Sequence, residues 1–201
     1  MFNDQADEDL MVMYQKGEVR AFEVLLSRHR KPVYNFILRF VGDRETSEDL
    51  LQEAFMRVIR GAEAYKRQAK FTTWLYTIAR NLCIDQLRKG ALRKHPSLDS
   101  RQSQDGQSGP TLGEQTADSR ANVERDATAG ELRLRIASAV ETLPDDQREV
   151  FLMREVANLP FKEIADITGV PENTVKSRMR YALERLQAAL SDYEEYARAL
   201  K

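Results

Sequence analysis

Apolar residues recur at helical spacing along most of the chain. Between residues 43 and 61 they lie on one side of a helix, at Leu50, Leu51, Ala54, Phe55, Val58 and Ile59. Asp43 or Thr46 suits the start of this helix, because acids are favoured at a helix N-terminus, and Gly61 suits its end. No segment shows the sustained alternation that is typical of strands. The pattern predicts an all-α fold.

Two further helical patterns flank this segment. The first, ended by Gly42, has apolar residues on both sides of Pro32, at Ala21, Phe22, Leu25, Leu26, Val33, Phe36, Ile37 and Phe40. The second is FTTWLYTIARNLCIDQLRK, residues 71–89, in which Leu75, Ile78 and Leu82 are candidate core positions. We expect these helices to form one small helical domain over residues 1–94.

The composition changes between residues 95 and 130. This segment is dominated by Ser, Gln, Gly, Asp and Thr, and its acids outnumber its bases. Too few apolar residues are present to offset the entropy lost on ordering, so the segment is predicted to be a flexible acidic linker. Two roles stay open for it, a plain tether or an acidic strand that mimics nucleic acid in a basic channel.

Helical spacing returns after the linker and predicts a second small helical domain, residues 131–201. Within it, FKEIADITGVPENTVKSRMR has the pattern of a helix-turn-helix, with Gly169 in the turn and Pro171 in the first turn of the second helix. The buried side of that second helix is predicted to hold Val175, Met179, Ala182, Leu183 and Leu186. Lys176, Ser177, Arg180 and Tyr181 share another face, which suits the DNA major groove. An αα-hairpin with a solvated basic face is the alternative.

The charge distribution indicates two different partners. The formal net charge is −1, which argues against a simple polycation. Residues 65–94, however, contain eight Lys or Arg and one acid, whereas residues 43–53 contain five acids and one base. Adjacent patches of opposite sign are expected to bind different surfaces.

The residue patterns do not favour an enzyme. Cys83 is the single cysteine, which excludes an internal disulfide and a multi-cysteine zinc site, and it is expected to be a buried thiol. His29 and His95 are isolated, and no glycine-rich phosphate loop is present. We therefore expect no catalytic residue, metal or cofactor. The N-terminal stretch MFNDQADEDL is neither a signal peptide nor a membrane span, so we expect a cytoplasmic protein without membrane insertion.

Three motifs together resemble bacterial RNA polymerase sigma factors of the extracytoplasmic-function (ECF) group. DRETSEDLLQEAFMRVIR, residues 43–60, resembles region 2.2, and YKRQAKFTTWLYTIARNLCIDQLRK, residues 65–89, resembles regions 2.3 and 2.4. LPDDQREVFLMREVANLPFKEIADITGVPENTVKSRMRYALERL, residues 143–186, resembles region 4. The resemblance implies a two-domain sigma factor that directs promoter-specific transcription initiation.

The resemblance also implies partners. Core RNA polymerase would be bound through its clamp coiled coil and its flap, and Asp49, Gln52 and Glu53 would dock on the clamp coiled coil. Promoter DNA is the second expected partner. An anti-sigma factor is the third, although no residue identifies one.

The resemblance assigns DNA contacts in both domains. The loop from Lys66 to Thr72 would capture a flipped base of the non-template strand, and Asn81 would contact a base. The residues implied for the −10 element are Lys66, Lys70, Phe71, Thr72, Trp74, Arg80, Asn81, Arg88 and Lys89. Whether Phe71 or Trp74 itself touches a base or belongs to the core stays open. The residues implied for the −35 element are Arg154, Lys176, Ser177, Arg178, Arg180 and Tyr181.

Two other classes of protein remain to be excluded. A helix-turn-helix regulator with a sensing or dimerising N-terminal domain would bind DNA without polymerase, but it has no reason to contain the block from residue 43 to residue 89. An adaptor made only of interaction helices would bind no DNA.

Overall fold

The computed structural model describes residues 2, 4–68, 70–93, 132 and 134–199. Every regular element in this part of the chain is a helix, which confirms the all-α prediction. The predicted linker, residues 95–130, lies outside the described residues.

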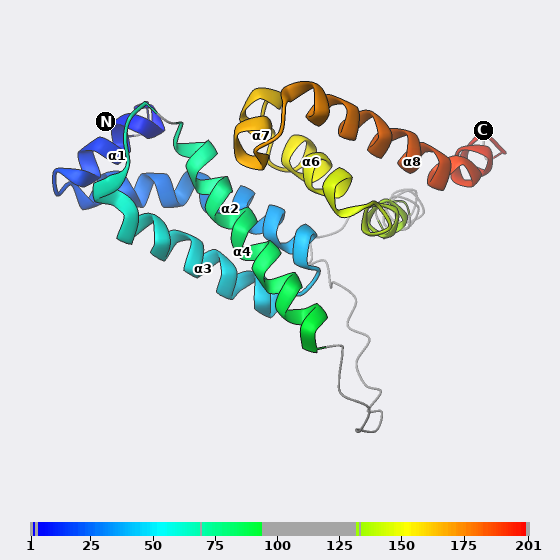
Figure 1. Cartoon of the computed structure of the whole chain (residues 1–201), viewed down its shortest axis with the longest axis horizontal. Helices are drawn as coiled ribbons and strands as arrows, with labels where there is room; N and C mark the ends of the chain where they lie inside the picture. Colours follow the sequence, from blue (N-terminus) through cyan, green and yellow to red (C-terminus); the bar gives the residue numbers. More distant parts are fainter. Residues whose placement is uncertain (1, 3, 69, 94–131, 133, 200–201) are drawn as a thin grey trace, which may run out of the picture.

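The first helical body is formed by residues on the N-terminal side of the linker. Its elements are α1 (Asp7–Gln15), α2 (Val19–Val41), α3 (Arg44–Gly61), the short 3-10 helix η1 (Ala62–Ala64) and α4 (Phe71–Arg93). Helices α2, α3 and α4 pack on one another, and α1 lies across one end of α2 (Figure 1). The largest side chains in the centre of this body are Phe36, Phe71 and Tyr76, which have at most 2% of their surface exposed.

Local chemistry explains the boundary between α2 and α3. Gly42 ends α2 with a φ of 81°, a left-handed conformation that costs little only for glycine. The next residue, Asp43, caps α3, because its carboxylate accepts a hydrogen bond from the Thr46 N–H at 2.7 Å. Pro32 lies inside α2 without ending it. Of the two helix starts left open, Asp43 and Thr46, the structure has Asp43 as the cap, and the expected helix end at Gly61 is confirmed.

The second helical body follows the linker. Residues 134–141 are helical, and α6 (Asp145–Glu155), α7 (Phe161–Thr168) and α8 (Glu172–Ala199) follow them. Gly169 forms the turn between α7 and α8 with a φ of 70°, as the helix-turn-helix pattern predicts. Pro171 stands immediately before α8 rather than inside its first turn, and its carbonyl accepts the hydrogen bonds of Thr174 and Val175.

One predicted core residue is wrong, and one helix was not predicted. Leu183 on α8 is 49% exposed, although its chain neighbour Ala182 is fully buried. Ile59, on the apolar side of α3, is likewise 38% exposed beside the fully buried Val58. Adjacent helical residues point about 100° apart, so at the edge of a buried side one residue of a pair can be covered while the other faces solvent. Helix α1 was not predicted, because its acidic first turn and its short apolar run are typical of an exposed terminal segment.

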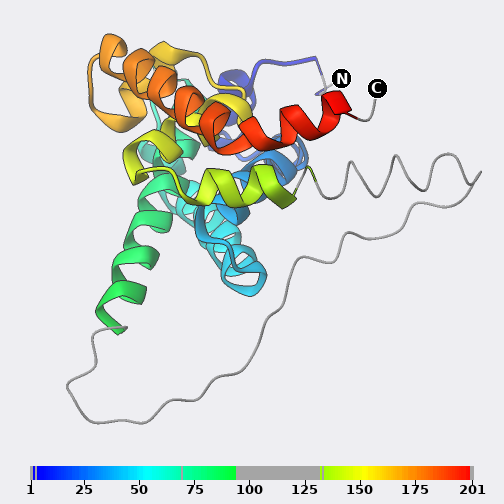
Figure 2. The ribbon, with the colours of Figure 1, turned by 90° about the vertical axis from the view of Figure 1, so that its right-hand side faces the viewer.

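The two bodies pack against each other. Helix α7 lies against α4, and α6 lies against α2 (Figures 1 and 2). On the α6 side, the guanidinium of Arg148 lies 5.6 Å from the centre of the Phe40 ring of α2. On the α7 side, the carboxylate of Glu163 contacts Lys70 and Thr72 at the beginning of α4.

Candidate nucleic-acid interface

Helix α4 has one buried side and one exposed polar side. Leu75, Ala79 and Cys83 are fully buried. Burial raises the pKa of the Cys83 thiol to about 12, which confirms the expectation of an unreactive buried cysteine. The exposed side bears Asn81, Arg88 and Lys89, the residues for which −10 contacts are predicted.

Arg80, on the same helix, is directed at the second body instead of solvent. It is 20% exposed, and its guanidinium pairs with both carboxylate oxygens of Glu149 on α6. Burial lowers the pKa of Arg80, and the nearby charges of Arg178 and Arg88 lower it further. The positive charges of Arg80, Arg178 and Arg88 therefore lie close enough to influence one another, and such a concentration of cations favours an anionic partner.

A second glutamate faces the beginning of α4. The Lys70 ammonium lies 2.5 Å from Oε1 of Glu163 on α7, and the Thr72 hydroxyl donates to Oε2 at 2.9 Å. The Glu163 side chain is only 8% exposed, whereas that of Lys70 is 64% exposed. The carboxylates of Glu163 and Glu149 thus accept hydrogen bonds from Lys70, Thr72 and Arg80, three residues for which the resemblance implies −10 contacts.

The aromatic residues at the start of α4 form one cluster. Phe71 has no exposed surface, and its ring packs against those of Tyr65 and His29. Trp74 is half-buried, and its ring centre lies 5.1 Å from that of Tyr65. A Cβ at Gly61 would lie 3.0 Å from the Trp74 ring, so this glycine permits the close packing of the indole. Phe71 has a core position in this arrangement, and Trp74 lies at the edge of the core.

Helix α8 presents the predicted reading face of the second body to solvent. Lys176, Ser177, Arg180 and Tyr181 are all exposed. Lys176 pairs with Glu172 at 2.7 Å, and the Arg180 guanidinium lies 4.8 Å from the centre of the Tyr181 ring. In the described part of the chain, the polar contacts of Lys176, Ser177 and Arg180 are with neighbours on α8 itself, so these side chains can turn toward a ligand without unfolding the helix.

The other two predicted −35 residues, Arg178 and Arg154, are partly buried and contact other segments of the second body. Arg178 is 26% exposed and pairs with Asp146 of α6 at 3.1 Å. Arg154 donates to the Leu159 carbonyl at 3.2 Å, and its guanidinium lies 5.0 Å from the centre of the Phe161 ring. Both arginines therefore help to assemble the second body.

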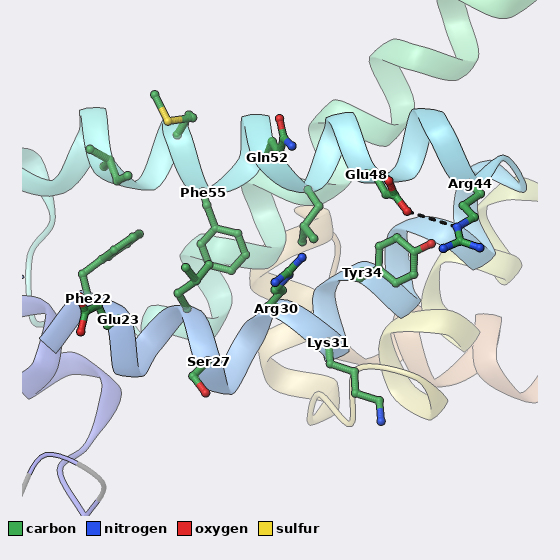
Figure 3. Close-up of a pocket in the computed structure, with 14 residues that line it drawn as sticks. Phe22, Glu23, Ser27, Arg30, Lys31, Tyr34, Arg44, Glu48, Gln52 and Phe55 are labelled. Atoms are coloured by element: carbon green, nitrogen blue, oxygen red, sulfur yellow. Dashed lines mark hydrogen bonds and ion pairs between the residues drawn. The ribbon is translucent and has the colours of Figure 1, made fainter. Parts of the chain in front are cut away.

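Helix α3 presents the predicted docking residues on its outer side. Asp49 and Gln52 are exposed, and Glu53 pairs with Arg57 at 2.9 Å. Hydrogen bonding from Arg57 holds the pKa of Glu53 below its usual value. Of these three residues, Gln52 lines an open groove of about 1040 Å³ between α2 and α3 (Figure 3).

The groove combines apolar and charged lining. Figure 3 shows Phe55 of α3 and Tyr34 and Arg30 of α2 between the two helices. Met56 and Ile59, both lining residues, are 43% and 38% exposed. Helical spacing alone did not indicate this groove, because it places Phe55 and Ile59 on one apolar side without showing where that side is left uncovered. Their exposed neighbour Met56 was the signal that could have indicated it.

Comparison with known proteins now decides the family. The sigma-70 region 2 profile matches residues 25–93, and the sigma-70 region 4 profile matches residues 133–186. The chain is 32% identical to the ECF RNA polymerase sigma factor SigW of Bacillus subtilis (strain 168), over 89% of this chain and 93% of that protein. The chain belongs to the ECF group of RNA polymerase sigma factors. It directs promoter-specific transcription initiation and is not an enzyme. A stand-alone regulator and a DNA-free adaptor are thereby excluded.

Two solved structures have the fold of this sigma factor. One is CnrH in complex with the cytosolic domain of CnrY, with a TM-score of 0.67 and 21% identity, over 94% of this chain and 99% of that chain. The other is the sigma factor RpoE of Bartonella quintana in complex with the anti-sigma factor NepR, with a TM-score of 0.62 and 23% identity, over 85% and 96% of the two chains. At these identities the likeness concerns the fold alone.

None of the described helices is long and apolar enough to cross a membrane. Nor does the described part of this sigma factor contain a group of three or more His, Cys, Asp or Glu residues that could hold a metal ion.

Proposed function

We propose that this sigma factor binds core RNA polymerase through α3 and contacts its promoter through α4 and α8. The supporting observation is that the exposed face of each of these helices has the charge its partner requires. Asn81, Arg88 and Lys89 on α4 and Lys176 and Arg180 on α8 offer donors to DNA, whereas Asp49 on α3 offers an acid.

The −10 element is assigned to the first body. Asn81 contacts a base of the opened non-template strand, and Arg88 and Lys89 contact its phosphates. Lys66 to Thr72 form the wall of the pocket for a flipped base, with Trp74 at its edge. Phe71 supports this pocket from the core, since it has no exposed surface.

The −35 element is assigned to α8. Lys176, Ser177, Arg180 and Tyr181 reach base edges in the major groove, and Arg178 and Arg154 border them on the phosphate side. Accordingly, the domain boundaries are residues 1–94 for region 2, 95–130 for the linker and 131–201 for region 4.

The polymerase site is assigned to the outer side of α3 and the adjoining groove. Asp49, Gln52 and Glu53 meet the basic surface of the clamp coiled coil, and region 4 meets the flap. Met56 and Ile59 add apolar surface that a partner helix can bury. We further propose a cytoplasmic location and an anti-sigma factor as inhibitor, since the Bartonella quintana protein of this fold was solved with one.

DNA binding requires the two bodies to separate. Lys70, Thr72 and Arg80 cannot meet DNA while Glu163 and Glu149 accept their hydrogen bonds. Binding of the two bodies to separate sites on polymerase supplies the free energy for this opening.

The polymerase assignment is tested by reversing one charge. Asp49→Arg places a cation on the docking face, and Glu18→Arg is the matched control, since Glu18 is exposed at the start of α2 and its side chain caps nothing. In a pull-down with core polymerase, the Asp49 variant should lose association at least about tenfold, an electrostatic penalty of about 1.4 kcal/mol, while the control binds normally. Equal binding by both variants would remove the docking assignment.

A further inference from the structure

Helix α1 reaches the basic loop, defined here as residues 65–68 and 70, with polar side chains along its length. Gln15 lies beside the start of the loop, Asp9 beside its middle and Glu8 beside its end. Glu8 and Gln15 are seven residues apart, which places them on the same face of the helix.

Gln15 fixes the point where the chain leaves η1. Its amide nitrogen donates to the Ala62 carbonyl at 2.7 Å and to the Tyr65 carbonyl at 2.9 Å. One amide group thus joins the first residue of η1 to the first residue of the loop, so the direction in which the loop leaves η1 is set by α1.

Glu8 fixes the point where the loop becomes α4. Its Oε1 accepts a hydrogen bond from the Phe71 N–H at 3.0 Å. Phe71 is the first residue of α4, where backbone N–H groups have no partner within the helix and the helix dipole favours an anion. Glu8 therefore acts as an N-cap supplied by a different helix.

Charge complements these two contacts. Lys66, Arg67 and Lys70 repel one another, and Asp9 pairs with Arg67 at 2.6 Å. The negative charges of Asp7 and Glu8 also reach Tyr65, where desolvation by burial and then these two acids raise the pKa of the phenol to about 12.

Helix α1 is itself firmly attached to the first body. Leu10 and Met11 have no exposed surface. Asp7 pairs with Arg28 and with His29 of α2, each at 2.6 Å, and the His29 ring packs 5.3 Å from that of Phe71. A helix held in this way can impose a shape on a loop, whereas a frayed terminus cannot.

We propose that α1 positions the basic loop for base capture, with Glu8 and Gln15 as positioning residues. The loop needs a fixed shape because a pocket for an unstacked base must already exist when the base leaves the helix. Neither residue contacts DNA in this scheme, and both act through the backbone of the loop. The inference rests on the proposed role of the loop in −10 opening.

The test uses the full chain reconstituted with core polymerase and a promoter with 2-aminopurine in the −10 non-template strand. Glu8→Ala combined with Gln15→Ala should slow the fluorescence rise by about tenfold, the scale expected for misplaced binding groups. Glu8→Gln, which keeps a hydrogen-bond acceptor, should open the promoter nearly as fast as wild type. Glu18→Ala, which removes an exposed acid between α1 and α2, is the matched control.

Two further readouts separate positioning from a general loss of structure. Polymerase affinity of the double variant should stay close to wild type. Its urea midpoint should fall modestly, because a helix cap and two hydrogen bonds are lost, and the chain should stay folded under the assay conditions. Wild-type opening rates in that variant, or slow opening that Glu8→Gln with Gln15 retained does not rescue, would overturn the inference. Failure of the wild-type chain itself to open promoters would instead overturn the proposed function.

Discussion

Glu163 of region 4 accepts a hydrogen bond from Lys70 of region 2, with 2.5 Å between Nζ and Oε1. The two residues are distant in sequence, and Glu163 is almost fully buried by the contact. Glu149 pairs with Arg80 in the same manner one helix away. The acids of one domain therefore neutralise cations of the other at the positions proposed to meet DNA.

Removing these two acids should loosen the domains. In the chain without polymerase, Glu149→Gln with Glu163→Gln should increase the radius of gyration measured by X-ray scattering. Affinity for single-stranded −10 DNA should rise about fivefold, since two ion pairs, one of them largely exposed, are worth about 1 kcal/mol together.

Glu45→Gln with Glu48→Gln is the matched control, because it removes the same charge from exposed positions on α3. DNA affinities must be compared at one salt concentration, since salt weakens both the ion pairs and the DNA contacts. An equal gain in DNA affinity in both double variants would show a general charge effect and contradict the role of Glu149 and Glu163.

The reading face of α8 predicts a defect confined to the −35 element. Lys176→Ala and Arg180→Ala should each weaken promoter binding by about 1–3 kcal/mol in a filter assay with holoenzyme. Arg20→Ala, at an exposed position of α2, should change nothing. Since neither α8 side chain lies near α3, polymerase binding should stay intact, and an equal loss of it would contradict the assignment.

The burial pattern of α8 predicts that the same substitution lowers stability by very different amounts at two nearby leucines. Leu186 is 7% exposed and Leu183 is 49% exposed. Leu186→Ala should lower the free energy of unfolding by about 2–5 kcal/mol, and Leu183→Ala by less than about 0.5 kcal/mol. Urea unfolding followed by circular dichroism measures both, and equal losses would restore Leu183 to the core.

The contacts of Asp7 predict how the stability of the fold depends on pH. Burial alone would raise the pKa of Asp7, but hydrogen bonds from His29 and Arg28 outweigh it and hold the pKa below its usual value. A lowered pKa gives stability that is complete above about pH 4 and is lost as the pH falls through the folded-state pKa. The stability difference between wild type and Asp7→Asn should therefore shrink on acidification, and a difference that stays constant with pH would contradict this.

The fold was largely predictable from sequence because its signals are local. Asp43 and Gly42 define a helix boundary by their own chemistry, and the turn at Gly169 follows from the left-handed conformation that glycine tolerates. The exposed faces of α4 and α8 follow from helical spacing, so Asn81, Lys176 and Arg180 were found correctly on exposed surfaces.

The contacts between distant segments were not predictable in this way. Nothing near Glu163 in the sequence indicates that it meets Lys70, and nothing near Gln15 indicates that it holds the carbonyls of Ala62 and Tyr65. The exposure of Ile59 was not predictable for a related reason. Helical spacing identifies the apolar side of a helix, but it does not show how much of that side another helix covers.

The central claim is that this chain brings polymerase to promoters defined by two short elements. The most direct measurement reconstitutes it with core RNA polymerase and maps transcription starts across a genome. The account predicts starts that share a pair of upstream motifs at fixed spacing. With the Lys176→Ala variant, transcription from these starts should depend less on the −35 motif. Starts without a shared motif pair, or the same starts with core polymerase alone, would contradict it.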